Sequence, residues 1–329
     1  MIVHSILSNS ITVSLHDAFK LDLKYGTLLV SLLVGIGILG GAKKIANIVS
    51  VLVPFMSMIY ISLALFISFK NIGALPKVLS LIVESAFGIR AFGGATLSLI
   101  IMTGIKRGLF SNEAGMGSAP NAAASVSTSH PVKQGLVQTL GVFVDTLVIC
   151  NATAFMILLS GDLYLDKSLQ GITLVQSAIT NQVGQIGTIL ISISVLLFSL
   201  STIFGCYFYG ETNLKYLIKD KRAINVFKTL VIGMIIFGGL AESALVWNLG
   251  DFFMGIMSFI NLVSILPLSK YALDALKDYR EQKKAGLNPV YSAIDRKGLE
   301  DIDCWHEVEV NNELYHEDEV RSTDEQKFA

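Results

Sequence analysis

The chain has 329 residues, of which 52% are hydrophobic and 16% are charged, and its formal net charge is -1. A soluble domain of this size needs more charged side chains to cover its surface, so the composition indicates an integral membrane protein. The near-zero net charge provides no electrostatic footprint for nucleic acid, and we expect no nucleic-acid partner. The three cysteines, Cys150, Cys206 and Cys304, have no paired spacing, which predicts neither a disulfide framework nor a zinc site.

Apolar stretches divide the chain into three parts. Residues 1–24 are expected to be a polar lead-in, residues 25–268 a transmembrane domain, and residues 269–329 a charged cytoplasmic tail. Because roughly 20 apolar residues cross the hydrocarbon core, we expect an all-α polytopic fold with about seven transmembrane helices. The expected spans are 25–41, 49–69, 91–105, 135–159, 186–209, 226–245 and 249–268, with an interfacial helix at 75–87 and a loop at 161–184.

Basic residues predict which ends of these spans face the cytoplasm. In a seven-span topology the basic clusters fall on one side, whereas Trp247 and Asp251 fall on the other. The positive-inside rule then predicts a plasma-membrane protein with its C-terminus in the cytoplasm. The last 29 residues hold ten acids and two bases, which is typical of a solvated tail. The basic clusters are Lys43-Lys44, Lys106-Arg107, Lys215 through Arg222, and the residues from Lys270 onward.

Lys106–Ala124 is the most informative stretch, a run of small residues that also carries Asn112 and Glu113. Small residues allow close approach of helices in lipid, and polar side chains near the bilayer are costly unless they are paired. From residue types alone, a Gly/Ala-rich cytoplasmic loop is the alternative.

This stretch resembles the signature of the alanine/glycine:cation symporters, bacterial and archaeal sodium-coupled transporters of small amino acids. The signature residues are Asn112, Glu113, Gly115, Gly117 and Ser118. The resemblance covers nearly the whole chain. Further matching runs are Gly40–Ala46, Leu52–Met56, His130–Leu136, Gly141–Thr146, Tyr207–Glu211, Asn288–Val290 and Asp303–Trp305.

The resemblance implies a transporter and not an enzyme. Its fold would consist of two inverted five-helix repeats, with substrate and sodium held between discontinuous helices near the midplane of the bilayer. The match begins just before the family's fifth span, so the first four spans are expected to be absent from an N-terminally truncated chain. Sodium is the implied coupling ion, and no other cofactor is implied. The implied partners are a small amino acid, sodium and the lipid membrane.

Two other classes of function remain open. In the first of these classes the chain does not transport by itself. It is then either a non-transporting fragment or half of a split transporter that is completed by a separately encoded N-terminal fragment. For the symporter itself, the missing spans are expected to impair transport, and we expect no sodium-dependent alanine uptake by this chain alone. A seven-span receptor or an intramembrane enzyme is the third class, but the spans contain no nucleophile–base pair or metal cluster.

Gly93 and Gly94 head the expected span 91–105 and are the candidate helix break. Glycine tolerates an unwound backbone, and the freed amides would meet the carboxylate of the substrate. A flexible helix start is the alternative.

Ser201 and Thr202 present adjacent hydroxyl oxygens, the type of ligand that sodium prefers. Residue types alone favour hydroxyls that bond back to their own helix, whereas the resemblance implies sodium-site hydroxyls on this helix. Thr202 and Cys206 lie one turn apart on the same face, and both are candidate substrate-binding residues. Cys206 stands where the family usually has Trp, which would enlarge the pocket or remove a wall.

Asp145, Asn151 and Glu211 are polar residues inside apolar spans. An acid within a span is a functional candidate by default. Pairing with a neighbouring helix or a loop amide is the alternative for each of them.

Overall fold

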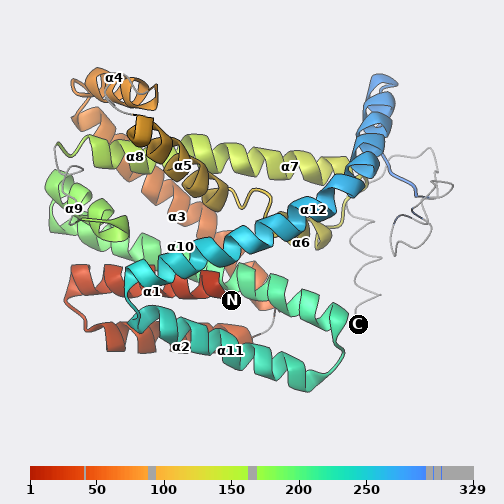
Figure 1. The fold of residues 1–329 in the computed structure, drawn as a ribbon, viewed down its shortest axis with the longest axis horizontal. Coiled ribbons are helices and arrows are strands. Elements are labelled where there is room, and N and C mark those ends of the chain that lie inside the picture. Colours follow the sequence, from red (N-terminus) through yellow and green to blue (C-terminus); the bar gives the residue numbers. More distant parts are fainter. Residues whose placement is uncertain (41, 88–93, 162–168, 294–298, 300–304, 306–329) are drawn as a thin grey trace. The chain divides into compact units, whose positions relative to one another are not determined.

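The computed structural model describes residues 1–40, 42–87, 94–161, 169–293, 299 and 305. Within these ranges the regular structure is helical (Figure 1). The chain divides into two compact units. One is formed by Met1–Val126 and Val137–Pro267, and the other by Ser127–Leu136 and Leu268–Ala329.

The helices follow the expected spans closely and add four elements that the sequence did not indicate, α1, α6, α9 and a π-helical turn, η1. In chain order they are α1 (Ile2–Phe19), α2 (Leu23–Leu39), α3 (Ala42–Lys70), α4 (Leu75–Ala86), α5 (Gly94–Ser111), α6 (Ala119–Ala124), α7 (Pro131–Val144), η1 (Asp145–Cys150), α8 (Asn151–Leu158), α9 (Gly171–Val183), α10 (Gln185–Leu217), α11 (Lys221–Leu240) and α12 (Ser243–Lys284).

Five helical stretches of the described chain are long and apolar enough to cross a membrane, judged by length and composition alone. The apolar helix α2 is shorter, with 17 residues. These findings fit a multi-pass membrane protein, and the count of seven spans stays a prediction. The five stretches are Val53–Lys70, Pro131–Leu158, Gln185–Leu217, Lys221–Leu240 and Ser243–Lys284.

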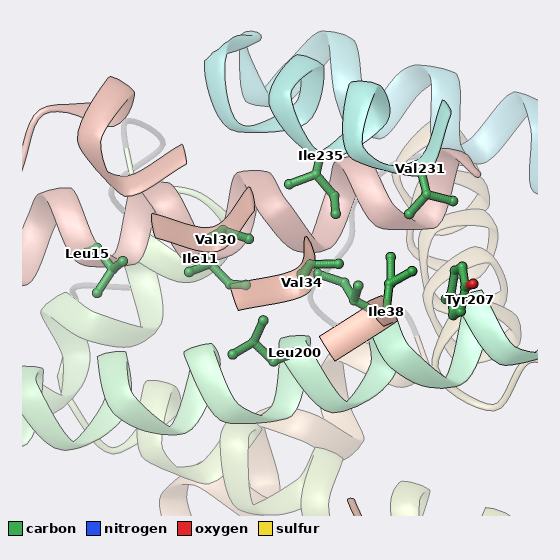
Figure 2. Close-up of a cluster of buried hydrophobic side chains, with 10 residues drawn as sticks. Ile11, Leu15, Val30, Val34, Ile38, Leu200, Tyr207, Val231 and Ile235 are labelled. Carbon is green, nitrogen blue, oxygen red and sulfur yellow. The ribbon is translucent and has the colours of Figure 1, made fainter. Parts of the chain in front are cut away.

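One apolar core of the larger unit lies between α1, α2, α10 and α11 (Figure 1). Figure 2 shows side chains from these four helices converging on one another. Residues 1–24, expected to be a polar lead-in, thus form a helix that packs against α2, α9, α10 and α11. The buried residues of this core are Ile11, Leu15, Val30, Val34, Ile38, Leu200, Ile203, Tyr207, Val231 and Ile235.

Polar side chains of α1 bond directly to the backbone of α11. Four buried residues, one turn or less apart, each donate to a carbonyl oxygen of that helix. The close contact requires glycine on α11, because a Cβ at Gly238 would overlap the backbone of Ser5. Small residues and interhelical hydrogen bonds are what associate helices in lipid. The bonds are Ser5 Oγ to Met234 O (2.9 Å), Ser8 Oγ to Ile235 O (2.8 Å), Asn9 Nδ2 to Gly238 O (2.9 Å) and Thr12 Oγ1 to Gly239 O (3.3 Å).

The segment expected as a loop at 161–184 contains α9, which packs against α1 and α10. Gln176 on α9 is buried, and its Nε2 donates to Ser14 Oγ at 3.0 Å and to Ser192 Oγ at 2.8 Å. This helix is therefore attached to the core by polar contacts, which explains why its sequence is not continuously apolar.

The smaller unit is organised around His130, whose side chain is fully buried. Its Nδ1 accepts from the backbone N–H of Val132 at 3.2 Å and so caps the start of α7. With Nδ1 acting as the acceptor, Nε2 carries the proton and donates to Asp278 Oδ2 at 3.1 Å. The rings of Tyr279 and Tyr291 lie edge-on to the imidazole, each with its centroid 5.1 Å away.

Further hydrogen bonds fix the chain that follows α12 within this unit. Lys133 Nζ donates to Asn288 Oδ1 at 2.7 Å, and Gln282 bonds to both backbone groups of Val290. The first part of the tail expected at 269–329 is therefore ordered helix and packed chain as far as residue 293.

The α1–α11 contact can be tested with two glycines of the same helix. A Cβ at Gly238 would overlap Ser5, whereas a Cβ at Gly233 meets no atom within 4 Å. We expect Gly238→Ala to lower the free energy of unfolding by about 1–3 kcal/mol. We expect the control Gly233→Ala to leave it unchanged or to raise it by up to about 1 kcal/mol. Thermal unfolding of the purified variants measures both, and equal melting temperatures would contradict the contact.

Candidate functional site

The helical path through the signature is interrupted. α5 ends at Ser111, the chain unwinds over residues 112–118, and helix resumes with α6 at Ala119. Within this unwound segment φ is 49° at Glu113, 74° at Gly115 and 79° at Gly117. Positive φ is costly for residues with a Cβ, so two of the three positions are glycine.

The observed break lies in the signature itself. The sequence-based candidate for the break was Gly93-Gly94. Gly93 lies outside the described residues, and Gly94 is the first residue of α5. A role for these two glycines in substrate binding stays a prediction.

Two asparagine side chains hold the carbonyl groups of the unwound segment. Asn261 Nδ2, on α12, donates to Gly115 O at 3.0 Å, and Asn121 Nδ2 donates to Gly117 O at 2.9 Å. Asn261 also limits residue 117 to glycine, because a Cβ there would lie 2.8 Å from its Oδ1. Met116 is buried and anchors the segment in an apolar cluster with α1 and α12.

Several backbone N–H groups of the same segment, unlike the two carbonyl groups, have no hydrogen-bond partner among the described residues. Among the described residues, no hydrogen bond is recorded for the backbone N–H of Gly115, Gly117 or Ser118. The Ser118 Oγ atom is buried and also has no partner there. The segment thus has the carbonyl oxygens of Gly115 and Gly117 occupied by side chains, and three of its N–H groups have no described partner. N–H groups of this kind suit an anionic ligand group.

The signature contacts α10 through Asn213 Nδ2, which donates to Asn121 Oδ1 at 2.8 Å. The Glu113 carboxylate also acts electrostatically on Cys206 and Tyr209 of α10. Asn112, next to it, accepts a 2.8 Å hydrogen bond from Thr146 Oγ1 through its Oδ1. The structure therefore gathers the signature residues and one of the α10 candidates, Cys206, in one region.

The two candidate sodium ligands bond to their own helix. Ser201 Oγ donates to Phe198 O at 2.7 Å, and Thr202 Oγ1 donates to the same carbonyl at 3.0 Å. This is the arrangement that residue types alone favoured. A hydroxyl that donates its proton keeps its oxygen lone pairs, so both oxygens are still able to coordinate a cation. Ser201 is buried, whereas Thr202 is exposed.

An ion pair that the sequence did not indicate joins α5 to α12. Arg107 Nη2 donates to both carboxylate oxygens of Asp251, at 3.0 and 2.7 Å. The guanidinium also lies over the Trp247 ring, 4.8 Å from its centroid, and that ring contacts Phe110. A planar guanidinium suits both the carboxylate and the aromatic face.

The contact was not expected from the seven-span topology. Arg107 and Asp251 were placed on opposite sides of the membrane because the span was expected to end at residue 105. The helix instead continues to Ser111, and the chain returns to helix at α6. The two side chains are in direct contact all the same. No local signal in the sequence pairs positions so far apart.

The ion pair can be tested by a double-mutant cycle with Arg107→Gln and Asp251→Asn. We expect each single variant to be destabilised and the double variant to be less destabilised than the sum, with a coupling of about 2 kcal/mol. Lys277 and Glu281, 4.0 Å apart and exposed, provide the control cycle, for which we expect about 0.5 kcal/mol or less. Chemical unfolding of the purified variants measures both cycles, and equal coupling in the two would contradict a special role for the α5–α12 pair.

Comparison with known proteins identifies the family. The model of the sodium:alanine symporter family matches residues 1–293. The chain is 46% identical over 306 residues to the probable sodium/glutamine symporter GlnT of Bacillus subtilis, covering 93% of this chain and 64% of that protein. It is 40% identical over 307 residues to the amino-acid carrier protein AlsT of the same organism, covering 93% and 65%.

A third relative is the sodium/proton-dependent alanine carrier protein of Bacillus sp. strain PS3, 34% identical over 321 residues, with 93% of this chain and 72% of that protein covered. The chain spans less than two thirds of the length of GlnT and AlsT. Because the family match covers most of the chain and includes the unwound segment, this chain belongs to the sodium:alanine symporter family, a family of transporters and not of enzymes.

Proposed function

We propose that this chain takes part in sodium-coupled symport of small neutral amino acids, alanine and glycine in particular, across the plasma membrane. The unwound segment carries the proposal. Its carbonyls at Gly115 and Gly117 are occupied by asparagine side chains, whereas the N–H groups of Gly115, Gly117 and Ser118 make no described hydrogen bond. Discontinuous helices in transporters use such groups to hold the carboxylate of a substrate.

For sodium, we propose Ser201 and Thr202 on α10 as ligands. Their oxygens are hard donors of the type that sodium prefers. The same helix carries Cys206, which is within electrostatic reach of Glu113 in the unwound segment. A sodium ion on this helix would therefore be bound close to the part of the chain proposed to hold the substrate.

The side chain of the substrate would meet the region around Cys206. A cysteine leaves more room there than the Trp usual in the family. Glutamine is therefore the second candidate substrate, since GlnT is named a probable sodium/glutamine symporter. Cys206→Trp would shift preference toward alanine and glycine if this residue lines the pocket.

For the whole transporter, we propose two inverted repeats, seven spans from this chain and a cytoplasmic C-terminus. Alternating access would then move one helix group relative to another around the site. The Arg107–Asp251 pair and the Asn261–Gly115 hydrogen bond both connect the broken helix to α12. Any motion of α12 would consequently reach the unwound segment.

A chimera tests the function. The matched region of this chain replaces the corresponding region of GlnT in cells that lack endogenous uptake of alanine and glutamine. We expect uptake of labelled alanine or glutamine in sodium chloride and none in choline chloride. Joint replacement of Ser201 and Thr202 by alanine should raise the half-saturating sodium concentration about tenfold, since about 1.4 kcal/mol of cation binding would be lost.

Ser194→Ala is the matched control for the sodium ligands. Ser194 is also a buried α10 hydroxyl that donates to its own helix, at 2.8 Å to Leu190 O. We expect it to leave the sodium dependence unchanged. Uptake that is equal in sodium and choline would refute sodium coupling, and an equal effect of Ser194→Ala would refute the assignment of Ser201 and Thr202.

A further inference from the structure

The π-helical turn η1 interrupts a helical stretch that is long and apolar enough to cross a membrane, Pro131–Leu158. π-Helical turns inside α-helices occur frequently at functional sites. The first residue of the turn is Asp145, an acid within this apolar stretch. A charged carboxylate within an apolar span is costly unless another group neutralises its charge.

Asp145 and its neighbour meet the end of α5, where the chain unwinds. Ser111 Oγ donates to Asp145 Oδ2 at 2.5 Å, and Thr146 Oγ1 donates to Asn112 Oδ1 at 2.8 Å. Two consecutive residues of η1 thus face two consecutive residues of the broken helix. The result is a cluster of carboxylate, amide and hydroxyl oxygens at the start of the unwound segment.

The charge of this cluster is not balanced by the described side chains. None of the ion pairs in the described part of the chain includes Asp145. Its described donors are neutral, the Ser111 hydroxyl and the Cys150 thiol at 3.9 Å. A cation held among these oxygens would neutralise the carboxylate.

One carboxylate surrounded by neutral oxygens matches a single positive charge. Calcium sites use several acidic or carbonyl oxygens, and magnesium requires strict octahedral geometry. Among the described residues, no group of three or more His, Cys, Asp or Glu is placed to hold a metal ion. The ligand chemistry therefore favours a hard monovalent cation.

We propose that Asp145, Ser111, Asn112 and Thr146 form a sodium site, separate from the one proposed at Ser201 and Thr202. The inference rests on the proposed sodium-coupled function. A cation here would fix Ser111 and Asn112, the residues from which the unwound segment starts. Sodium binding would then order the amides that meet the substrate, and by thermodynamic reciprocity substrate would raise the affinity for sodium.

Cys150 reports directly on this site. Its Sγ lies 3.2 Å from Ser111 Oγ, and the side chain is partly exposed. In a chain with Cys206→Ser and Cys304→Ser, Cys150 is the only thiol. We expect sodium chloride to slow maleimide labelling of Cys150 in the purified chain, by about fivefold at a sodium concentration of four times Kd. Potassium and choline chloride at equal ionic strength should not slow it.

Two variants locate the effect. Asp145→Asn should abolish the protection by sodium. Ser111→Ala keeps the carboxylate and should raise the half-protecting sodium concentration severalfold. The control is Asp17→Asn. The Asp17 carboxylate is not part of the proposed site and accepts a 2.8 Å hydrogen bond from Thr173, so this variant should leave the protection by sodium intact. If Asp145→Asn does not fold, as judged by gel filtration, Ser111→Ala and the comparison of salts still decide the question.

Equal labelling rates in sodium and choline would overturn the site, as would full protection in Asp145→Asn. Protection that follows pH but not sodium would also overturn it, because a proton would then occupy the carboxylate. Failure here is distinguishable from failure of the proposed function. Sodium-dependent uptake by the chimera without protection of Cys150 counts against this site alone, and protection without uptake counts against symport alone.

Discussion

In lipid no water is available to complete a hydrogen bond, so each polar group of a spanning helix must find its partner within the protein. The contact between α1 and α11 follows from this constraint, with serine, asparagine and threonine side chains donating to main-chain carbonyls. The same constraint operates at η1. Asn151 Nδ2 donates to the carbonyls of Thr146 and Leu147, at 3.1 and 3.2 Å, where the wider π turn changes the helical register.

The unwound segment departs from this rule. Its carbonyls at Gly115 and Gly117 are satisfied by side chains, whereas the amides of Gly115, Gly117 and Ser118 have no described partner. N–H donors without a partner favour a carboxylate over a cation at these three amides. The oxygens of Ser111, Asn112, Asp145 and Thr146 gather at the other end of the same segment, where a cation is favoured instead. The substrate carboxylate would thus bind to backbone N–H groups, and the coupling ion to oxygen atoms only a few residues away.

The smaller unit brings together two motifs that are far apart in the sequence. His130 and Lys133 belong to the motif before α7, and Asn288 and Val290 to the motif after α12. In the structure the imidazole caps α7 and bonds to Asp278, while Lys133 bonds to Asn288. The two motifs are therefore joined directly by the hydrogen bond between Lys133 and Asn288.

The sequence by itself determined the membrane class, the family and the positions of the apolar helices, because these depend on composition, local hydropathy and a long contiguous signature. It did not predict α1, whose polar residues are suited to a spanning bundle only because α11 supplies their acceptors. It did not predict the break within the signature either, since small residues are equally typical of a loop, and the break expected at Gly93-Gly94 stays a prediction. The unwinding at residues 112–118, the pairing of Arg107 with Asp251 and the oxygens around Asp145 were decided by the tertiary structure alone. Each depends on partners far apart in the chain, and hydropathy and residue type carry no information about which distant groups will meet.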